Sequence, residues 1–175
     1  MSVIQSRKQL SAGTKNGSMR YFNSSCVKFN DYKRYREEIV VREKLNLSTT
    51  KYASKSGNML IFQPVIFNRN IGIPEKSENR LQGFEVSRGY KDVDAYAITL
   101  PDGFKIDASP EPIIINSEFG NYELKVTKDA NGALQVSRNF LIKKGTYSKE
   151  QFEEFRNFQI EVAKADKSKV VIIKN

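Results

Sequence analysis

The amino-acid sequence predicts a mainly β protein, an antiparallel β-sandwich with one C-terminal amphipathic helix at about 148–165 and a final strand. Short segments in which apolar and polar residues alternate recur along most of the chain, and turn residues separate them. Near the C-terminus the apolar spacing changes to that of a helix. The 175 residues are 39% hydrophobic and 11% aromatic, which is enough for one sizeable core. We therefore expect the helix to cover one open end or face of the sandwich.

The beginning of the chain is predicted to be a flexible basic leader at 1–30, followed by a single sandwich-like domain at 31–175. Residues 1–24 are rich in Ser, Gly, Asn and Lys, and they contain four basic side chains and no acidic one. The segment 32–38 could begin a short helix or run directly into a strand, and its pattern does not separate the two.

The first half of the domain contains three expected strands. Alternation predicts one at 39–47. After a turn or loop at 54–58 comes the most apolar run of the chain, 59–67. Pro64 must break this run, bulge it or place it at a sheet edge, because proline cannot donate a ladder hydrogen bond. The next expected elements are a loop at 68–80 and a strand at 81–86.

The second half contains the clearest hairpin signal. Strands at 122–127 and 134–142 flank the turn sequence Asp129-Ala130-Asn131-Gly132. Residues 96–100 also alternate, and they end at the turn sequence Pro101-Asp102-Gly103. Further strands are expected at 104–106, 113–115 and 170–173.

Arg138 lies on the apolar face of the second hairpin strand, which is unusual for a charged residue. It could be a structural arginine that extends to a sheet edge or pairs with a carboxylate. It could alternatively bind a ligand.

The helix near 148–165 has the signals of a defined start. Ser148 and Gln151 have the spacing of a capping box, and Tyr147 and Phe152 have that of a hydrophobic staple. Phe152, Phe155, Phe158, Val162 and Ala163 form one apolar arc, and Ile160 falls outside it.

The cysteine and histidine counts exclude several kinds of active site. There is no histidine, so His-dependent triads, HExxH zinc sites and imidazole bases cannot be built from this chain. The single Cys26 cannot form an intramolecular disulfide. We expect no enzymatic activity, no catalytic residue, no cofactor and no metal.

Charge and hydropathy bear on partners. The net charge is +9, but +4 of it lies in residues 1–24, and no basic stripe with interleaved aromatics follows. We therefore expect no nucleic-acid partner. No apolar run approaches 18 residues, so no membrane span is expected, and the first residues lack the apolar region of a signal peptide.

The order of several short motifs resembles a known family. In sequence they are Gln63-Pro64, Asn68-Arg69, Arg80, the segment 96–104, Pro110, the 122–142 hairpin, Gly145, Tyr147, Phe155-Arg156-Asn157-Phe158, Lys164-Ala165-Asp166 and the end 170–174. This order resembles the C-terminal β-rich domain of unknown function that follows a transglutaminase-like core in multidomain exported bacterial proteins. The resemblance covers about 39–175. The chain departs from the family at Gly83, where a proline is more usual, so the start of that strand is open.

The resemblance implies an accessory role. The family's Cys-His-Asp triad belongs to the preceding core, and none of it carries over, because Cys26 precedes the similar region and no histidine exists. The implied partner is the transglutaminase-like core of the parent protein, or another protein surface. The implied location is periplasmic or otherwise exported.

The expected function is therefore a non-catalytic module that packs on or positions a transglutaminase-like domain. The alternative is a free-standing module that binds a peptide or a glycan. The candidate interaction surface consists of Tyr32, Tyr35, Phe62, Phe67, Arg69, Arg80 and Arg88. Its aromatic residues could instead belong to the core, and its arginines could simply be solvated. Exposed apolar residues in 32–47 and 59–71 could also make the isolated domain self-associate.

Overall fold

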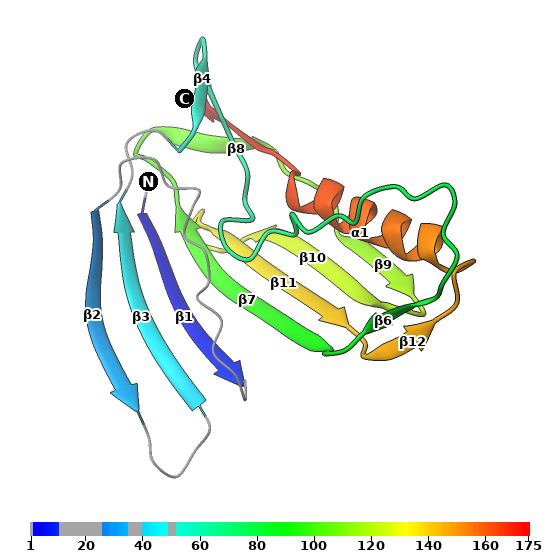
Figure 1. The fold of residues 1–175 in the computed structure, drawn as a ribbon. Helices are drawn as coiled ribbons and strands as arrows, with labels where there is room; N and C mark the ends of the chain where they lie inside the picture. Colours follow the sequence, from blue (N-terminus) through cyan, green and yellow to red (C-terminus); the bar gives the residue numbers. More distant parts are fainter. Residues whose placement is uncertain (1, 11–25, 35–39, 49–51) are drawn as a thin grey trace.

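The structure, a computed structural model, describes residues 2–10, 26–34, 40–48 and 52–175, with side chains from residue 52 onward. The described residues form antiparallel sheets and one helix, as the sequence predicts (Figure 1). The largest sheet has seven strands in the spatial order β2 (Cys26–Arg34), β3 (Val40–Ser48), β1 (Ser2–Leu10), β7 (Tyr90–Thr99), β11 (Leu134–Ile142), β10 (Gly120–Lys128) and β9 (Ile113–Ser117).

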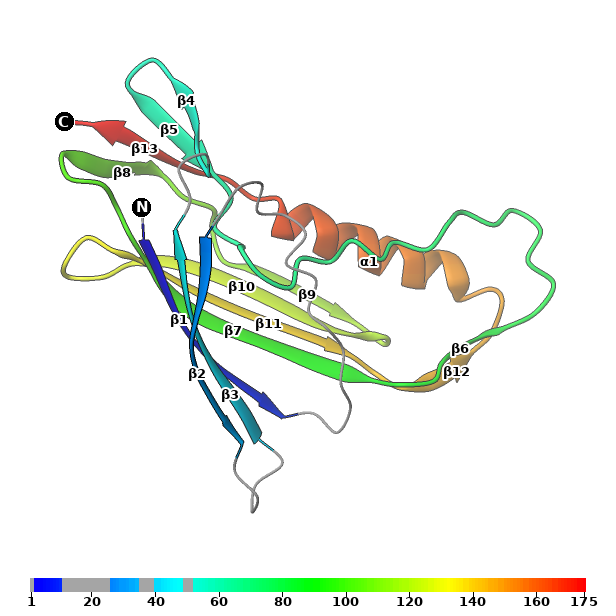
Figure 2. The same cartoon turned by 60° about the vertical axis from the view of Figure 1, so that its left-hand side comes forward.

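Two smaller sheets and the helix complete the fold. A four-stranded sheet has the order β4 (Ser54–Ser56), β5 (Met59–Phe62), β13 (Val170–Lys174) and β8 (Phe104–Ala108). A two-stranded sheet pairs β12 (Gly145–Tyr147) with β6 (Phe84–Val86). The helix α1 (Phe152–Asp166) and the four-stranded sheet lie on the same side of the large sheet and form its second layer (Figure 2).

The predicted hairpin is confirmed, with β10 and β11 paired from Gly120–Ile142 to Lys128–Leu134. Its turn forms because the Asp129 carboxylate accepts hydrogen bonds from the main-chain N–H groups of Asn131 and Ala133, both 2.9 Å long. Gly132 has a φ of 82°, a conformation that glycine adopts without strain. The hairpin is therefore specified by local sequence.

The predictions for 54–67 are confirmed and the one for 81–86 needs correction. The turn expected within 54–58 joins β4 to β5 in a tight hairpin, because Gly57, with a φ of 60°, permits it. The strand expected at 81–86 forms only at Phe84–Val86. At Gly83 a side-chain carbon would lie 2.4 Å from the carbonyl oxygen of Tyr147, so only glycine fits there. The break at Pro64 is confirmed, since β5 ends at Phe62.

The helix is confirmed but starts later than predicted. Its N-cap is Gln151, without a side-chain cap hydrogen bond. The main-chain N–H of Ser148 donates to Oε1 of Gln151 over 2.8 Å, and the Ser148 side chain bonds Glu150. Tyr147 and Phe152 do not form a simple staple. Both rings pack on Phe84, with centroid distances of 5.1 and 5.5 Å, so an aromatic cluster holds the start of the helix.

The core lies between α1 and the inner face of the large sheet. Along β11 the residues Leu134, Val136, Arg138, Phe140 and Ile142 are buried in strict alternation. From the helix, Phe158, Val162 and Ala165 are buried against this face, whereas Phe155 is only partly buried. The predicted apolar arc of the helix therefore does face the core, but the centre of the buried face lies nearer Phe158 and Val162 than Phe155.

Segments of the predicted leader lie within described strands. Ser2–Leu10 pairs with β3, and its first residues also pair with β7. Cys26 begins β2. Whether residues 1–30 are flexible stays a prediction, as does the single-domain boundary at residue 31.

Candidate functional site

Arg138 lies at the centre of a buried charged cluster between the large sheet and α1. Its side chain is 0% exposed, so it does not extend to a sheet edge. Nε donates to Oδ1 of Asp166 over 2.7 Å, and Nη2 donates to Oδ2 of the same carboxylate over 2.9 Å. Nη1 lies 3.4 Å from Oδ2 of Asp94 on β7. The expected carboxylate pairing of Arg138 is confirmed, and this bidentate geometry is the strong form of such a pair.

Aromatic rings complete the surroundings of the guanidinium. Its carbon lies 5.3 Å from the ring centre of Tyr122 and 5.4 Å from that of Phe140. The Tyr122 hydroxyl donates to Oδ1 of Asp166 over 2.7 Å. Burial alone lowers the pKa of Arg138, but hydrogen bonds and charge from Asp166 outweigh it and raise that pKa. Burial, with the charge of Asp166, raises the pKa of Tyr122, so its hydroxyl stays a donor.

The same cluster fixes the segment 63–83 between β5 and β6, which we call the anchored loop. Asn68 donates through Nδ2 to Oδ1 of Asp94 over 2.8 Å. The main-chain N–H of Asn70 donates to Oδ2 of Asp166 over 2.7 Å. The Asn70 side chain also donates to the carbonyl and side-chain oxygens of Gln159. Both carboxylates that pair with Arg138 therefore also hold the loop.

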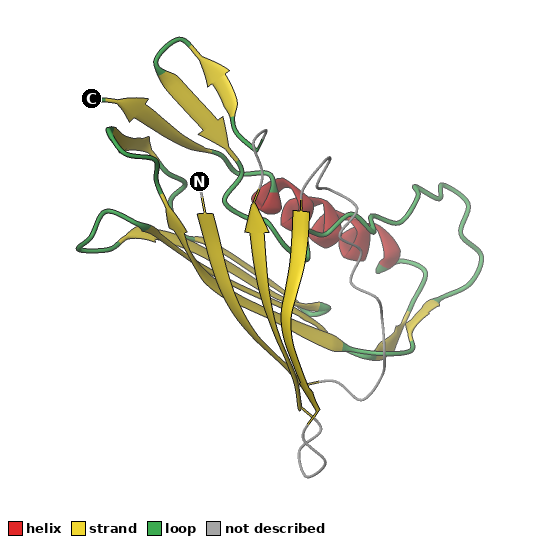
Figure 3. Ribbon diagram, turned by 90° about the vertical axis from the view of Figure 1, so that its left-hand side faces the viewer, coloured by secondary structure: helices red, strands yellow, loops and turns green. Residues whose placement is uncertain are grey.

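Further contacts hold the two ends of the anchored loop. Near its start, the Tyr96 hydroxyl accepts from the N–H of Ile66 over 3.0 Å and donates to the carbonyl of Pro64 over 2.6 Å. Midway, Nε of Arg156 donates to the carbonyl of Pro74 over 3.1 Å. Near its end, the Arg80 guanidinium lies 4.2 Å from the ring centre of Phe152. The loop runs beside α1 along much of the helix (Figure 3).

Despite this anchoring, the loop presents large apolar side chains to solvent. The exposed fractions are 67% for Ile71, 38% for Ile73 and 86% for Leu81. Exposed apolar side chains gathered on one segment are typical of interaction sites. The anchored loop is therefore the candidate functional surface of this domain.

Three residues of the predicted interaction surface, Phe67, Arg69 and Arg80, lie within the anchored loop, and Phe62 lies at the end of β5 directly before it. Phe62 is buried in the core, and Phe67 is partly buried and packs edge-on against Tyr96, with 5.7 Å between the ring centres. Arg69 bonds the side chain of Gln63, and Arg80 bonds the carbonyls of Gln82 and Gly83 within the anchored loop. Arg88 is exposed, the side chain of Tyr32 is outside the described part, and Tyr35 lies outside the described residues.

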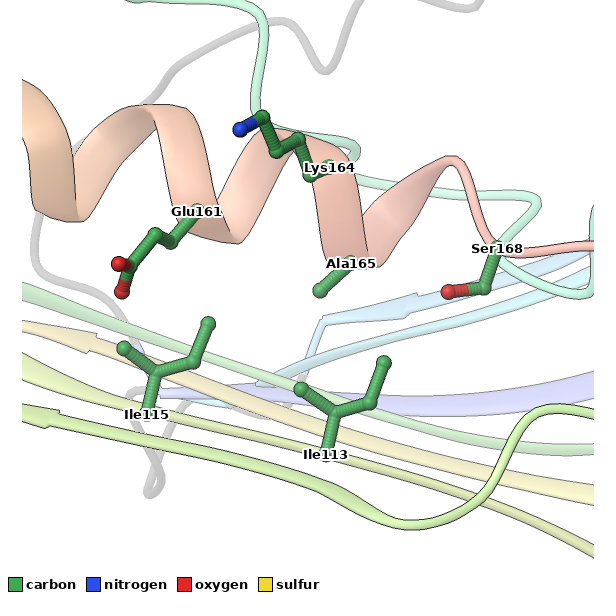
Figure 4. Close-up of a pocket in the computed structure, with 6 residues that line it drawn as sticks. All are labelled: Ile113, Ile115, Glu161, Lys164, Ala165 and Ser168. Carbon is green, nitrogen blue, oxygen red and sulfur yellow. The ribbon is translucent and has the colours of Figure 1, made fainter.

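A second surface feature, the β9 groove, lies between β9 and α1. It has a volume of about 370 Å³ and is lined by Ile113, Ile115, Glu161, Lys164, Ala165 and Ser168 (Figure 4). None of these side chains is aromatic, so the groove offers no stacking platform for a sugar ring or a base.

The described residues show neither a metal-site arrangement nor a helix suited to cross a membrane. Over the described ranges, no group of three or more Cys, Asp and Glu side chains has the arrangement of a metal site. In the same part of the chain, α1 falls short of the length and apolarity that a membrane-crossing helix needs.

Comparisons with known proteins give a family and a fold. A search of curated proteins finds no match. Among solved structures, a putative protease from Parabacteroides distasonis ATCC 8503 aligns with a TM-score of 0.52 at 17% identity. The alignment covers 65% of this chain and 23% of the solved chain, so the fold recurs as roughly a quarter of a longer protein.

The family model of DUF3858, described as a domain of unknown function with a solved structure, matches residues 58–172. This range includes the hairpin, the helix and every side chain of the Arg138 cluster. Because the match spans more than half of the chain, the protein belongs to the DUF3858 family.

Proposed function

We propose that this domain is a non-catalytic accessory module that packs on, or positions, a transglutaminase-like partner domain within a longer exported bacterial protein. The observation that carries the proposal is the anchored loop. Its main chain is held by the Arg138 cluster, yet Ile71, Ile73 and Leu81 are exposed. A segment that is already fixed in one conformation loses little conformational entropy when it docks. More of the favourable free energy from burying its apolar side chains therefore remains for binding.

Two further observations support an accessory role. The solved protein that shares the fold is about four times longer than the aligned region, so there the fold is one part of a longer chain. The sequence has no histidine, and so it cannot activate Cys26 in the way that a Cys-His enzyme does.

The alternative, a module that binds a free peptide or glycan, has less support. Glycan binding commonly uses aromatic platforms, and the β9 groove has none. Of the aromatic residues of the predicted surface whose side chains are described, Phe62 is buried and Phe67 is partly buried against the core.

The test uses the domain together with the domain that precedes it in its parent gene. We expect the two domains to tumble as one body in NMR relaxation measurements, and Ile71→Ser combined with Leu81→Ser to uncouple them. The matched control is Ile114→Ser, which changes an exposed isoleucine outside the loop. Independent tumbling of the unmodified pair would contradict the proposal.

The absence of catalysis is tested separately. The purified chain should show no transglutaminase or cysteine-protease turnover, because no general base accompanies the thiol. Turnover that disappears in a Cys26→Ala variant would show that the domain is an enzyme.

A further inference from the structure

The strands β1, β2 and β3 form a sheet segment, the N-terminal unit, that one short ladder joins to the rest of the fold. Inside the unit, β3 pairs with β1 through nine residue pairs and with β2 through eight. Outside it, the described strand that pairs with the unit is β7, through the four residue pairs of 2–5 with 96–99. The chain leaves the unit between Ser48 and Tyr52. Opening four residue pairs therefore detaches the whole unit with its internal ladders intact.

The ladder between β1 and β7 is shorter than the two strands that form it. β1 continues through residues 6–10, and β7 extends over 90–95. Figure 1 and Figure 2 show that the two strands lie side by side near the N-terminus and diverge from there. Among the described strands, none pairs with 90–95 on the side away from β11. This stretch of β7 is thus an open sheet edge, on which Tyr90 and Val93 are 45% and 46% exposed.

The paired stretch of β7 lies beside the core. Tyr96 is 5% exposed and Ile98 is 0% exposed. Without β1, the sheet edge next to these two side chains would meet water. After detachment this edge therefore favours the return of a β1 strand, from its own chain or from a second one.

We propose that the N-terminal unit is exchanged between two copies of this chain, so that β1 of each copy pairs with β7 of the other over residues 2–10 and 91–99. The first four pairs are those of the single chain, so the fit of this occupant is already present in the structure. Each copy gives one strand and receives one, and the exchange therefore closes as a two-fold dimer.

The open stretch of β7 favours the strand of a second copy over the chain's own strand. A unit from another copy is free of the connection that ties it, in the single chain, to the same body that it covers. Its β1 strand can therefore continue in the same register along 91–95, which adds five residue pairs to the four.

The continued register also brings opposite charges together. It places Arg7 opposite Asp94 and diagonal to the partly exposed Asp92, and these two acidic residues share one phase of β7. Opposite charges at such positions stabilise a cross-strand pair. In the single chain the ladder ends at residue 5, before this position is reached.

The first experiment is sedimentation of the whole chain after equilibration over a concentration series. The dimer should form slowly, because the ladder within each chain must open first, and its fraction should rise with concentration. A chain that stays monomeric up to about 1 mM would overturn the proposal.

A disulfide that closes the ladder within one chain tests whether the dimer forms by exchange. Residues directly opposite in an antiparallel pair have Cα atoms about 4.5–5.5 Å apart, within the range of a disulfide. In a Cys26→Ser background, Ile4→Cys with Ala97→Cys should lock β1 on its own β7 when the dilute protein is oxidised. The locked chain should stay monomeric, and reduction should restore the dimer. A dimer that the lock does not affect would show that another surface joins the copies.

The second experiment tests the continued register between chains, again with Cys26→Ser as the background. It mixes a chain carrying Lys8→Cys with a chain carrying Val93→Cys, two positions that lie opposite each other only in the exchanged dimer. Mild oxidation should join the two variants covalently. The control mixes Lys8→Cys with Ile114→Cys, which is more exposed than Val93 but lies on β9. Equal cross-linking in both mixtures would contradict the exchange.

The third experiment is a charge reversal. Arg7→Glu puts an acidic residue opposite Asp94 and beside Asp92, and should weaken the dimer by about tenfold, since the contact occurs twice. Lys105→Glu is the control, because it changes the net charge equally at an exposed position of β8 and should leave the dimer unchanged. An equal effect of the two variants would mean that net charge, and not this register, governs the association.

Discussion

Arg138 is completely buried, yet its charge is matched inside the core by two carboxylates and two aromatic rings. Removing ions from water costs several kcal/mol each, and this cost is offset only where geometry and hydrogen bonding are complete. Here Asp166 accepts from Arg138, from Tyr122 and from the main chain of Asn70. The pair of Arg138 and Asp166 therefore connects the sheet, the helix and the loop.

We predict that Arg138→Met destabilises the domain by about 3–5 kcal/mol, because it leaves the carboxylates of Asp94 and Asp166 buried without their cation. Urea denaturation measures the change in the free energy of unfolding. Lys105→Met, at an exposed position, is the control and should stay within about 0.5 kcal/mol. Adding Asp94→Asn and Asp166→Asn to Arg138→Met should recover part of the loss. No recovery would mean that lost packing dominates.

The buried tyrosines make a prediction about alkaline pH. Burial raises the pKa of Tyr52 to about 12, and burial also raises the pKa values of Tyr96 and Tyr122. The folded pKa of each lies above the unfolded value of about 10. Their contribution to stability is therefore complete below pH 10 and is lost as the pH rises beyond it. The thermal unfolding midpoint should fall above about pH 10. A flat midpoint up to pH 11 would contradict this assignment.

At the scale of elements, α1 is held against the large sheet by its buried side chains, among them Phe158 and Val162. Phe158 is 4% exposed, and Phe158→Ala should cost about 3–5 kcal/mol. Phe155→Ala should cost less, because Phe155 is only partly buried. Ser148→Ala should stay within about 0.5 kcal/mol, since its side chain does not cap the helix. Chemical denaturation of the three variants gives the order, and a larger loss for Ser148→Ala than for Phe158→Ala would contradict it.

Elements specified by local sequence were predictable. The β10–β11 hairpin follows from alternation together with an Asp-Ala-Asn-Gly turn, and both signals lie within the element itself. The start of α1 was predicted less well. Tyr147 and Phe152 had the spacing of a staple, but both rings pack on the ring of Phe84, which is distant in sequence. Tertiary contacts therefore replaced a local capping pattern.

At the scale of the whole molecule, the predicted leader at 1–30 differs in composition from the domain that follows it. We predict that limited proteolysis trims the chain at a position between residues 20 and 38 before it cuts the β10–β11 hairpin, because residues 1–24 are polar and carry few apolar anchors. Mass spectrometry of the stable product gives the boundary. Protection of residues 1–20 as strong as that of the hairpin would mean that β1 is an integral strand.

The Arg138 cluster could be predicted only in part. Arg138 lies on an apolar strand face, which indicated that it has a partner. Along β7, Asp94 alternates in step with the inward-facing residues Tyr96 and Ile98. Asp166 follows Val162 by one helical turn, on the buried face of α1. The strand alternation and the helical spacing could therefore have identified Asp94 and Asp166 as candidate partners of Arg138. The pairing itself could not be predicted, because it depends on how β7, β11 and α1 pack together, which no local pattern encodes. The loop at 68–80 was predicted, but its anchoring by Asp94 and Asp166 was not, because it depends on the same packing.

The Arg138 cluster also has a consequence for the opening motions of the domain. Asn68 and Asn70 of the loop, Asp94 and Arg138 of the sheet and Asp166 of the helix are bonded in pairs, so that loop, sheet and helix are each joined to the other two. Opening any one of these three parts leaves buried polar groups of the other two without hydrogen-bond partners. Most surface loops open independently of the rest of the domain, but the anchored loop should open only together with the sheet and the helix. In native-state hydrogen exchange, the amide of Asn70 should exchange with the same free energy of opening as amides near Val162 and Arg138, as one cooperative unit.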